Sequence, residues 1–250
     1  MRTILVTGAT GMLGQAVVPE LLRRDVQVRA TSRRPRASSD GVEWRVADFT
    51  TGEGVTAAVE EVDTVIHLAA APYKGRYTDK VEVDGTKRLL QATTEAHIIY
   101  VSIVGVDRVP WGYFRTKLKA EALLKDNPRV SIIRATQFFP FMERPLRLMA
   151  KLGVMVMDPG IKAQPVDVRE VAQRVCQRVE DGPSGTIEEF GGPEILDTEA
   201  AMRQWLAAKG KRRPILRVRM PGRLGRAFRD GGLTTRAVPR GITTWQDYLR

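Results

Sequence analysis

The chain contains one cysteine, Cys176, in 250 residues, so no disulfide can form within it. This cysteine lies in a helical run over residues 169–180, where the simplest interpretation is a buried apolar residue. Histidine is almost as rare: His67 and His97 are the only two, and no His, Cys, Asp and Glu cluster has metal-ligand spacing. We therefore expect a reducing, cytoplasmic environment and no metal site.

Long apolar runs are also absent. None approaches the roughly 18 residues that a membrane-spanning helix needs. Residues 3–7 already have the pattern of a first strand, so we expect no signal peptide, no membrane partner and a soluble protein. With 43% hydrophobic residues, 250 residues are enough for one sizeable core with a smaller appended part.

Acidic residues are scarce in the last fifth of the chain. Residues 1–202 carry 27 basic and 27 acidic side chains, whereas residues 203–250 carry 13 basic and 2 acidic ones, so the net charge of +11 arises there. This segment lacks the aromatic platform on which single-stranded nucleic acid stacks. We expect a solvated surface and no specific nucleic-acid partner, with an acidic substrate or partner as the alternative.

What the sequence does contain is a regular alternation of apolar runs and amphipathic segments. The pattern predicts strands at 3–7, 26–31, 43–47, 63–69, 97–103 and 129–136, and helices at 12–24, 53–61, 79–96, 113–126 and 138–152. Such alternation is typical of an α/β fold with a doubly wound parallel sheet, the Rossmann fold. Residues 65–69 and 98–102 are apolar nearly throughout, which predicts strands in the middle of the sheet.

Residues 7–14, with the sequence TGATGMLG, join the first predicted strand to the first predicted helix. Gly8 permits a tight turn, Gly11 lets a pyrophosphate approach the backbone, and Gly14 allows the helix to lie close to the sheet. The N–H groups and positive dipole end of that helix then face the phosphates. A glycine triplet alone also fits a structural turn, but this location predicts a dinucleotide site. The residues assigned to it are Thr7, Gly8, Thr10, Gly11, Met12, Leu13 and Gly14.

The cofactor is indicated at the end of the second strand. An NAD-selective protein would carry an acid there for the ribose hydroxyls, whereas this chain has Ser32, Arg33 and Arg34. Two guanidinium groups suit a 2′-phosphate, so we predict NADP, with a solvated basic loop as the alternative. We expect an NADP-binding Rossmann domain at 1–153. Residues 154–250 are predicted to form a smaller substrate-covering region with a basic tail, not an independent domain.

Three polar residues after the fifth strand form a candidate catalytic set. Ser102 ends that strand, while Tyr113 and Lys117 lie one turn apart on the following helix. A neighbouring ammonium lowers a phenol's pKa, so Tyr113 is predicted to exchange a proton with a substrate oxygen that Ser102 also contacts. Lys117 would also hold the nicotinamide ribose. The spacing alone is common, but its location beyond a strand end is where ligands bind in such sheets.

With these motifs the chain resembles the short-chain dehydrogenase/reductase superfamily, in the extended and atypical NADP-binding branch that includes the NmrA-like proteins. The resemblance covers about residues 1–195 and rests on residues 7–14, 48–49, 67–70, 83–86, 102, 113–117 and 166–172. It implies that Asp48 meets the adenine amino group and Phe49 the adenine face. It assigns to the rest of the cofactor Leu68, Ala69, Ala70, Val101, Ala135, Thr136, Gln137 and Phe138. Asp48 also fits a helix cap, and His67 a satisfied strand histidine.

One spacing departs from the family pattern. Eleven residues separate Ser102 from Tyr113, fewer than is usual, and many atypical members keep the lysine but lose the tyrosine. The role of Tyr113 as proton donor therefore stays open, whereas Lys117 needs only its helix position.

The resulting hypothesis is an NADPH-dependent oxidoreductase that transfers a hydride between nicotinamide and a small organic carbonyl, enone or alcohol. The alternatives are a non-catalytic NADP-binding redox sensor that signals to a protein partner, and an NADP-dependent epimerase, dehydratase or isomerase; cofactor motifs do not separate them. The substrate pocket is expected from residues 72–80, 104–112 and 138–165. Its large apolar side chains favour an aromatic or polycyclic substrate. They are Tyr73, Tyr77, Trp111, Phe138, Phe139, Phe141 and Met142. Homo-oligomerisation is left open.

Overall fold

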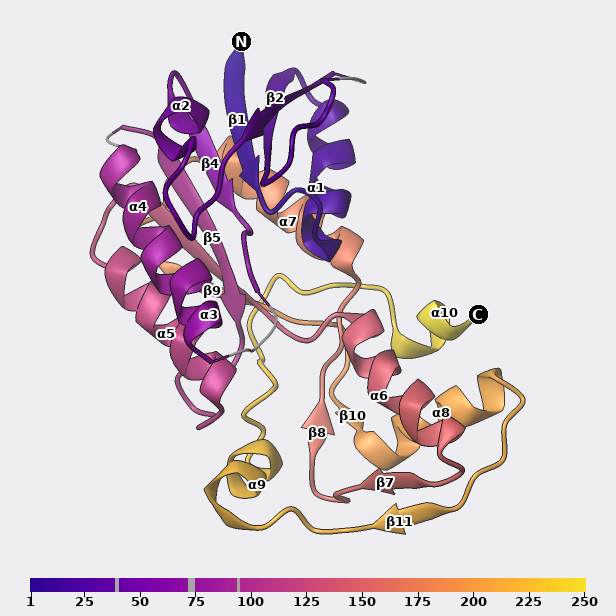
Figure 1. Ribbon diagram of the computed structural model, residues 1–250. Coiled ribbons are helices and arrows are strands. Elements are labelled where there is room, and N and C mark those ends of the chain that lie inside the picture. The colour runs from indigo at the N-terminus through magenta and orange to yellow at the C-terminus, as the bar shows by residue number, and fades with distance from the viewer. Residues whose placement is uncertain (39–40, 72–74, 94) are drawn as a thin grey trace. The chain divides into compact units, whose positions relative to one another are not determined.

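The computed structural model describes residues 1–38, 41–71, 75–93 and 95–250 (Figure 1). Its main sheet has the strand order β3-β2-β1-β4-β5-β6-β9. The strands are β1 (Arg2–Thr7), β2 (Val26–Ser32), β3 (Val42–Val46), β4 (Thr64–His67), β5 (His97–Ile103), β6 (Val130–Ala135) and β9 (Ile187–Phe190). The pairs from β3 to β5 are parallel. The chain order reverses at β1, between β2 and β4, and ligands bind outside the carboxyl ends of strands at such a reversal.

The central strands are apolar because both faces of the sheet are covered. Every residue of β4 is buried, and so are the first six of β5, which confirms the prediction that these segments lie in the middle of the sheet. Helices α1 (Met12–Leu22) and α7 (Val168–Asp181) lie on one face, and α2 (Val55–Val59), α4 (Gly85–Ala92) and α5 (Gly112–Leu124) on the other (Figure 1). The predicted doubly wound sheet is confirmed.

Two details differ from the sequence prediction. The helix expected at 79–96 is a succession of α3 (Arg76–Asp79), a π-helix η1 (Lys80–Asp84) and α4, which ends at Ala92. Strand β9 lies within residues 154–250, predicted from the sequence to form the smaller region, yet it belongs to the main sheet: the Ile132 N–H donates to the Thr186 carbonyl at 3.0 Å.

The described residues form two compact units that interleave in sequence. Unit 1 comprises residues 1–102, 115–133 and 169–188, and unit 2 comprises residues 103–114, 134–168 and 189–250. Unit 1 includes α7, where Cys176 is fully buried, as expected from the helical pattern. Burial raises the pKa of its thiol to about 12, so Cys176 is an inert packing residue.

Unit 2 has its own apolar core. Its elements are α6 (Phe139–Lys151), β7 (Met155–Met157), β8 (Lys162–Ala163), β10 (Leu196–Asp197), α8 (Thr198–Ala208), β11 (Ile215–Arg217), α9 (Gly222–Arg229) and α10 (Trp245–Leu249). Phe139, Trp205 and Trp245 are buried together in this core. Helix α8 begins where the Asp197 carboxylate accepts the Glu199 N–H at 2.9 Å, a side-chain N-cap.

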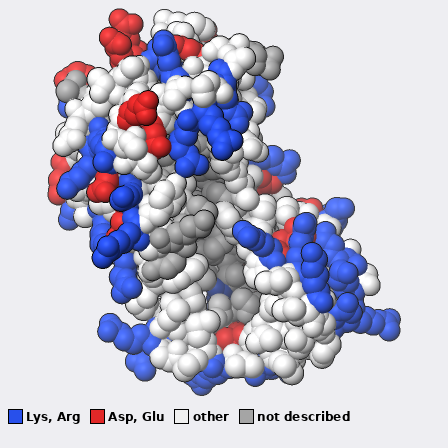
Figure 2. Space-filling model, in the orientation of Figure 1, with Lys and Arg blue, Asp and Glu red and all other residues white. Residues whose placement is uncertain are grey.

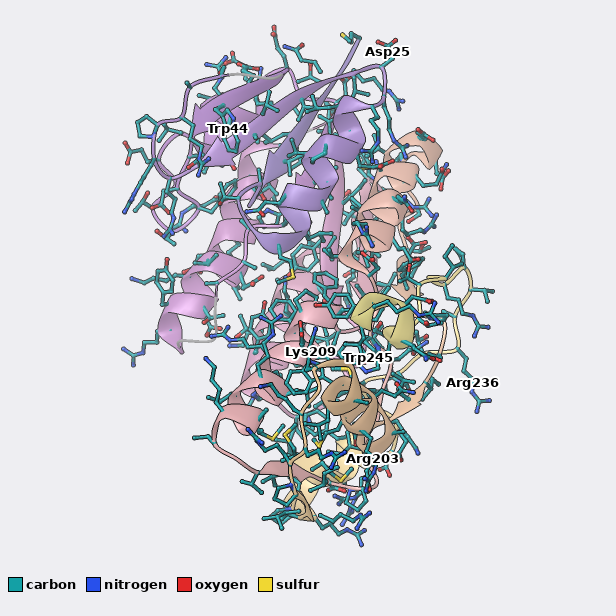
Figure 3. All side chains as sticks on the ribbon, turned by 90° about the vertical axis from the view of Figure 1, so that its right-hand side faces the viewer. Asp25, Trp44, Arg203, Lys209, Arg236 and Trp245 are labelled. Atoms are coloured by element: carbon teal, nitrogen blue, oxygen red, sulfur yellow. The ribbon has the colours of Figure 1, made fainter. Side chains whose placement is uncertain are left out.

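The basic C-terminal segment lies on the surface of unit 2. Twelve of its 13 basic residues are exposed; the exception, Arg229, pairs with the buried Asp158 at 2.6 Å. Arg203 and Arg236 extend outward in Figure 3, and blue side chains gather over the α6 and α8 region in Figure 2. No helix in the described part of the chain combines the length and apolar character needed to cross a membrane.

Candidate functional site

The loop after β1 has the geometry of a phosphate-binding turn. Gly8 has φ +64°, and a Cβ there would stand 2.5 Å from the Leu68 carbonyl oxygen. A Cβ on Gly14 would stand 2.5 Å from the Gly8 oxygen, so both positions require glycine. Gly11 is exposed and is the N-cap of α1, with no side chain to cover the first N–H groups of that helix. The helix therefore presents its positive end to solvent at the carboxyl end of β1.

Thr7 fixes the backbone of the neighbouring strand end. Its Oγ1 accepts the N–H groups of Leu68 and Ala69, each at 3.1 Å. Since Oγ1 accepts twice, its own O–H donates to His67 Nδ1, 2.9 Å away. This links the phosphate loop to the predicted cofactor residues after β4.

His67 continues this network into the helix layer. With Nδ1 accepting, Nε2 carries the proton and donates to Thr86 Oγ1 at 3.3 Å, and Thr86 donates to the Glu82 carbonyl at 2.5 Å. Burial, reinforced by the positive charge of Lys117, lowers the pKa of His67 to about 3. The imidazole is therefore neutral and bonded at both nitrogens, as a satisfied strand histidine would be.

The end of β2 carries the predicted adenosine contacts. Arg33 and Arg34 are exposed, and Arg33 Nη1 donates to the Tyr77 hydroxyl at 3.0 Å. Asp48 Oδ1 accepts the Thr50 N–H at 2.7 Å and the Thr50 hydroxyl at 2.6 Å. Burial raises the pKa of Asp48, but these hydrogen bonds and the Arg33 charge outweigh burial and leave that pKa below its ordinary value. Asp48 therefore holds a turn, while Gly54 is the N-cap of α2.

The Phe49 side chain is mostly buried in the core of unit 1. Its ring lies 5.5 Å from the His67 ring and packs among buried aliphatic side chains of unit 1, including Leu5 and Ala58. Phe49 is 6% exposed, so little of its surface is available for the predicted adenine contact.

Lys117 is held in a buried cradle. Its side chain is 7% exposed, and its Nζ lies 3.0 Å from Glu82 Oε2 and 3.1 Å from the Val101 carbonyl oxygen. The same ammonium lies 4.6 Å from the centre of the Tyr100 ring, whose hydroxyl donates to Glu82 Oε2 at 3.3 Å. Two of the three N–H bonds of Lys117 are accounted for by these two acceptors.

Several buried side-chain atoms have no hydrogen-bond partner among the residues that the structure describes, and two of the predicted site residues are among their owners. One is Ser102 Oγ in unit 1, and the other is the Gln137 amide in unit 2, whose nitrogen and oxygen are both unpaired. Leaving such a group unpaired costs about 1–3 kcal/mol. A ligand that pairs with either group would recover that free energy.

The predicted site residues fall into both units. Unit 1 brings together the phosphate loop and residues 32–34, 48–49, 68–70, 101–102 and 117. Tyr113 and residues 135–138 belong to unit 2, and helix α5 passes from one unit to the other after Phe114. Tyr113 packs against the apolar cluster of Val106, Val109 and Phe114. Tyr73 lies outside the described residues.

Sequence reasoning missed Glu82, although one signal was available. Glu82 lies between Val81 and Val83, and a glutamate is almost never fully buried unless it is paired. Among the described residues, no group of three or more His, Cys, Asp and Glu side chains is placed to hold a metal ion.

Comparison with known proteins identifies the family. Residues 8–135, about half of the chain, match the family model described as NAD(P)H-binding. The chain belongs to this family. The predicted membership of an NAD(P)-binding family is thereby confirmed, and the protein's cofactor is a nicotinamide dinucleotide.

Two curated relatives share part of this sequence. The chloroplastic divinyl chlorophyllide a 8-vinyl-reductase of Oryza sativa subsp. indica is 32% identical over 222 residues, 76% of this chain and 54% of the relative. The 3-beta-hydroxysteroid dehydrogenase of Mycolicibacterium neoaurum is 35% identical over 107 residues, 38% of this chain and 29% of the relative. The chain thus spans about half of the first relative and less of the second.

Solved structures share the fold across nearly the whole chain. An NADPH-dependent quinone oxidoreductase from Escherichia coli, complexed with NADPH, superposes with a TM-score of 0.81 at 19% identity, covering 98% of both chains. A short-chain dehydrogenase/reductase superfamily protein from Agrobacterium tumefaciens with bound NAD gives 0.75 at 20% identity, covering 99% of this chain and 95% of that one.

Proposed function

We propose that the protein is an NADPH-dependent oxidoreductase that transfers a hydride between the nicotinamide and a small organic carbonyl, enone or alcohol. The observation that carries the proposal is the end of β5. There Ser102 offers a buried hydroxyl without a partner among the described residues, and Lys117 offers a fixed ammonium beside Val101. Groups of this kind are suited to a ribose hydroxyl and a substrate oxygen.

NADP rather than NAD is proposed from the end of β2. Arg33 and Arg34 are exposed there, and no acid in the Ser32–Arg36 stretch competes for a ribose hydroxyl. Two planar cations fit a 2′-phosphate dianion, whereas NAD has no group for them to bind.

The residues then have separate tasks. The bound cofactor supplies the hydride that reaches the substrate carbon in the reducing direction. Lys117 donates to the nicotinamide ribose, and Ser102 donates to the substrate oxygen. Tyr113 gives its phenolic proton to that oxygen, so a carbonyl substrate becomes the neutral alcohol, and an enone becomes an enol that tautomerises to the saturated ketone. Residues 135–138 are proposed at the nicotinamide end, where the unpaired Gln137 amide supports a polar ligand contact.

An aromatic or polycyclic substrate is proposed from the side chains expected at the pocket. Trp111, Phe141 and Tyr77 all remain substantially exposed, although aromatic side chains are usually buried. The names of similar proteins, a chlorophyllide reductase, a hydroxysteroid dehydrogenase and a quinone oxidoreductase, refer to ring compounds and support this class.

A redox sensor is the second candidate function. The short interval from Ser102 to Tyr113 and the packing of Tyr113 on an apolar cluster favour it. A sensor would bind NADPH with no turnover of any compound.

Substitution of Tyr113 separates the two. We screen quinones, steroid ketones and enones by NADPH absorbance, then compare wild type with Tyr113→Phe. For an enzyme using this phenol, kcat falls by about 10²–10⁴ while NADPH affinity is unchanged. Tyr248→Phe, a tyrosine of α10, is the control and keeps full activity. If Tyr113→Phe keeps full activity, another group donates the proton. If the wild type binds NADPH tightly but turns over no compound of the panel, the protein is a sensor and not an enzyme.

A further inference from the structure

Glu82 is a fully buried acid in the π-helix η1, and neither the motifs nor the predicted catalytic set includes it. Its Oε2 receives the Lys117 ammonium at 3.0 Å and the Tyr100 hydroxyl at 3.3 Å. Single-turn π-helices of this kind occur frequently at functional sites.

The pairing changes what Lys117 can do. An ammonium next to a carboxylate forms a nearly neutral pair, whose field at a third group is much weaker than that of a free cation. The sequence-based expectation was that the charge of Lys117 lowers the pKa of Tyr113. With Glu82 in contact, the charge of Lys117 is largely cancelled, and its remaining capacity is a directional N–H.

The cradle also restricts the lysine side chain. The Glu82 carboxylate and the Val101 carbonyl each accept from Nζ, and the Tyr100 ring lies beside it, so the side chain of Lys117 has little rotamer freedom to lose when a ligand binds. A donor fixed in advance binds its acceptor without a further loss of entropy.

We propose that Glu82 is a positioning residue for cofactor binding: it holds Lys117 so that the third N–H of the ammonium donates to a hydroxyl of the nicotinamide ribose. The inference rests on the proposed function, since that function gives Lys117 the ribose. It adds an acid to the set, and it assigns Lys117 a hydrogen-bonding role in place of an electrostatic one.

The test compares two ligands by calorimetry. NADPH carries the nicotinamide ribose, whereas adenosine 2′,5′-bisphosphate ends before it. For Glu82→Gln, which keeps the shape and removes the charge, we expect NADPH affinity to fall about tenfold, as for one charge-assisted hydrogen bond. Affinity for adenosine 2′,5′-bisphosphate stays at the wild-type value. A structural defect would instead weaken both ligands together.

Three further variants complete the experiment. In Lys117→Met, the affinity for NADPH should fall by the same factor as in Glu82→Gln. The double variant should lose no more affinity than either single variant, because Glu82 and Lys117 act as one unit. Glu121→Gln replaces another buried acid, one turn after Lys117 on α5. This control should keep the wild-type ratio of NADPH affinity to adenosine 2′,5′-bisphosphate affinity. If Glu82→Gln does not fold, Tyr100→Phe removes one hydrogen bond to Glu82 and shifts the NADPH to bisphosphate ratio in the same direction.

The outcomes are distinct. Unchanged NADPH affinity in Lys117→Met contradicts the ribose role and with it that part of the proposed function. Loss in Lys117→Met with wild-type binding in Glu82→Gln overturns the positioning role of Glu82 alone. Equal loss for both ligands in Glu82→Gln also overturns it.

Discussion

The Lys117 ammonium and the His67 imidazole lie in the same buried layer but carry different charge. Glu82 compensates Lys117, whereas His67 has no acid beside it in the hydrogen bonds described above and stays neutral between Thr7 and Thr86. In a buried layer a charge persists only where a counter-charge is in contact. The charge of each buried residue at this site therefore depends on the groups in contact with it.

His67 makes stability depend on pH. Its pKa is about 3 in the folded protein and about 6.5 when unfolded, so below pH 6.5 the unfolded state binds the proton more readily. The free energy of unfolding should fall as pH falls from 6.5 to 5, by about 1.4 kcal/mol per pH unit at most for this residue. Urea unfolding at several pH values measures it. His67→Asn should flatten the slope; an unchanged slope would contradict a neutral His67.

Arg33 and Arg34 give a prediction for cofactor choice. We expect wild type to bind NADPH at least tenfold more tightly than NADH, about 1.4 kcal/mol. Arg33→Ala with Arg34→Ala should bring the two affinities close together, because only the 2′-phosphate needs the guanidinium groups. Calorimetry measures both, with the exposed Arg23→Ala as control. Equal affinities in the wild type would reject NADP selectivity.

At the scale of elements, the turn from β1 to α1 couples the sheet to the cofactor. Gly8 and Gly14 are fixed by contacts within the protein, while Gly11 faces solvent. A loop and helix N-terminus at a strand end can thus bind a phosphate only where the fold leaves their backbone N–H groups exposed. The hydrogen bonds of Thr7 also fix the backbone of the residues that follow β4.

These glycines have separable effects. Gly11→Val should abolish NADPH binding while circular dichroism and the unfolding midpoint change little, since Gly11 is exposed at the start of α1, where the pyrophosphate is predicted to meet the backbone. Gly8→Val is the contrasting variant: a side chain at φ +64° against the Leu68 carbonyl strains the fold, so its unfolding midpoint should drop. Normal NADPH binding by folded Gly11→Val would place the phosphates elsewhere.

At the scale of the whole molecule, charge is unevenly distributed along the chain. Residues 203–250 hold 13 basic and 2 acidic side chains, and several of the cations pair locally, as Arg217 does with Glu199 at 2.6 Å. Lys209 similarly reaches the buried Glu143 at 3.5 Å. The remaining positive surface attracts anions through its charge.

Nucleic-acid binding should therefore be weak and salt-dependent. We expect gel shifts with duplex and single-stranded DNA to disappear near physiological salt, because binding arises from counterion release alone. A shift that persists at about 200 mM salt and depends on sequence would show a specific site.

The sequence by itself determined the strands, most helices and the phosphate loop, because residues within one turn or one strand set these features. The role predicted for residues 7–14 rests on the glycine spacing together with its location between a strand and a helix. Tertiary structure decided the contacts between residues far apart in the sequence, which hydrophobic periodicity does not predict. Glu82 meets Lys117 from 35 positions away, and β9 joins β6 across some 50 residues. Such contacts depend on how helices pack on the sheet, so the partner that fixes the candidate lysine became visible only in the folded chain.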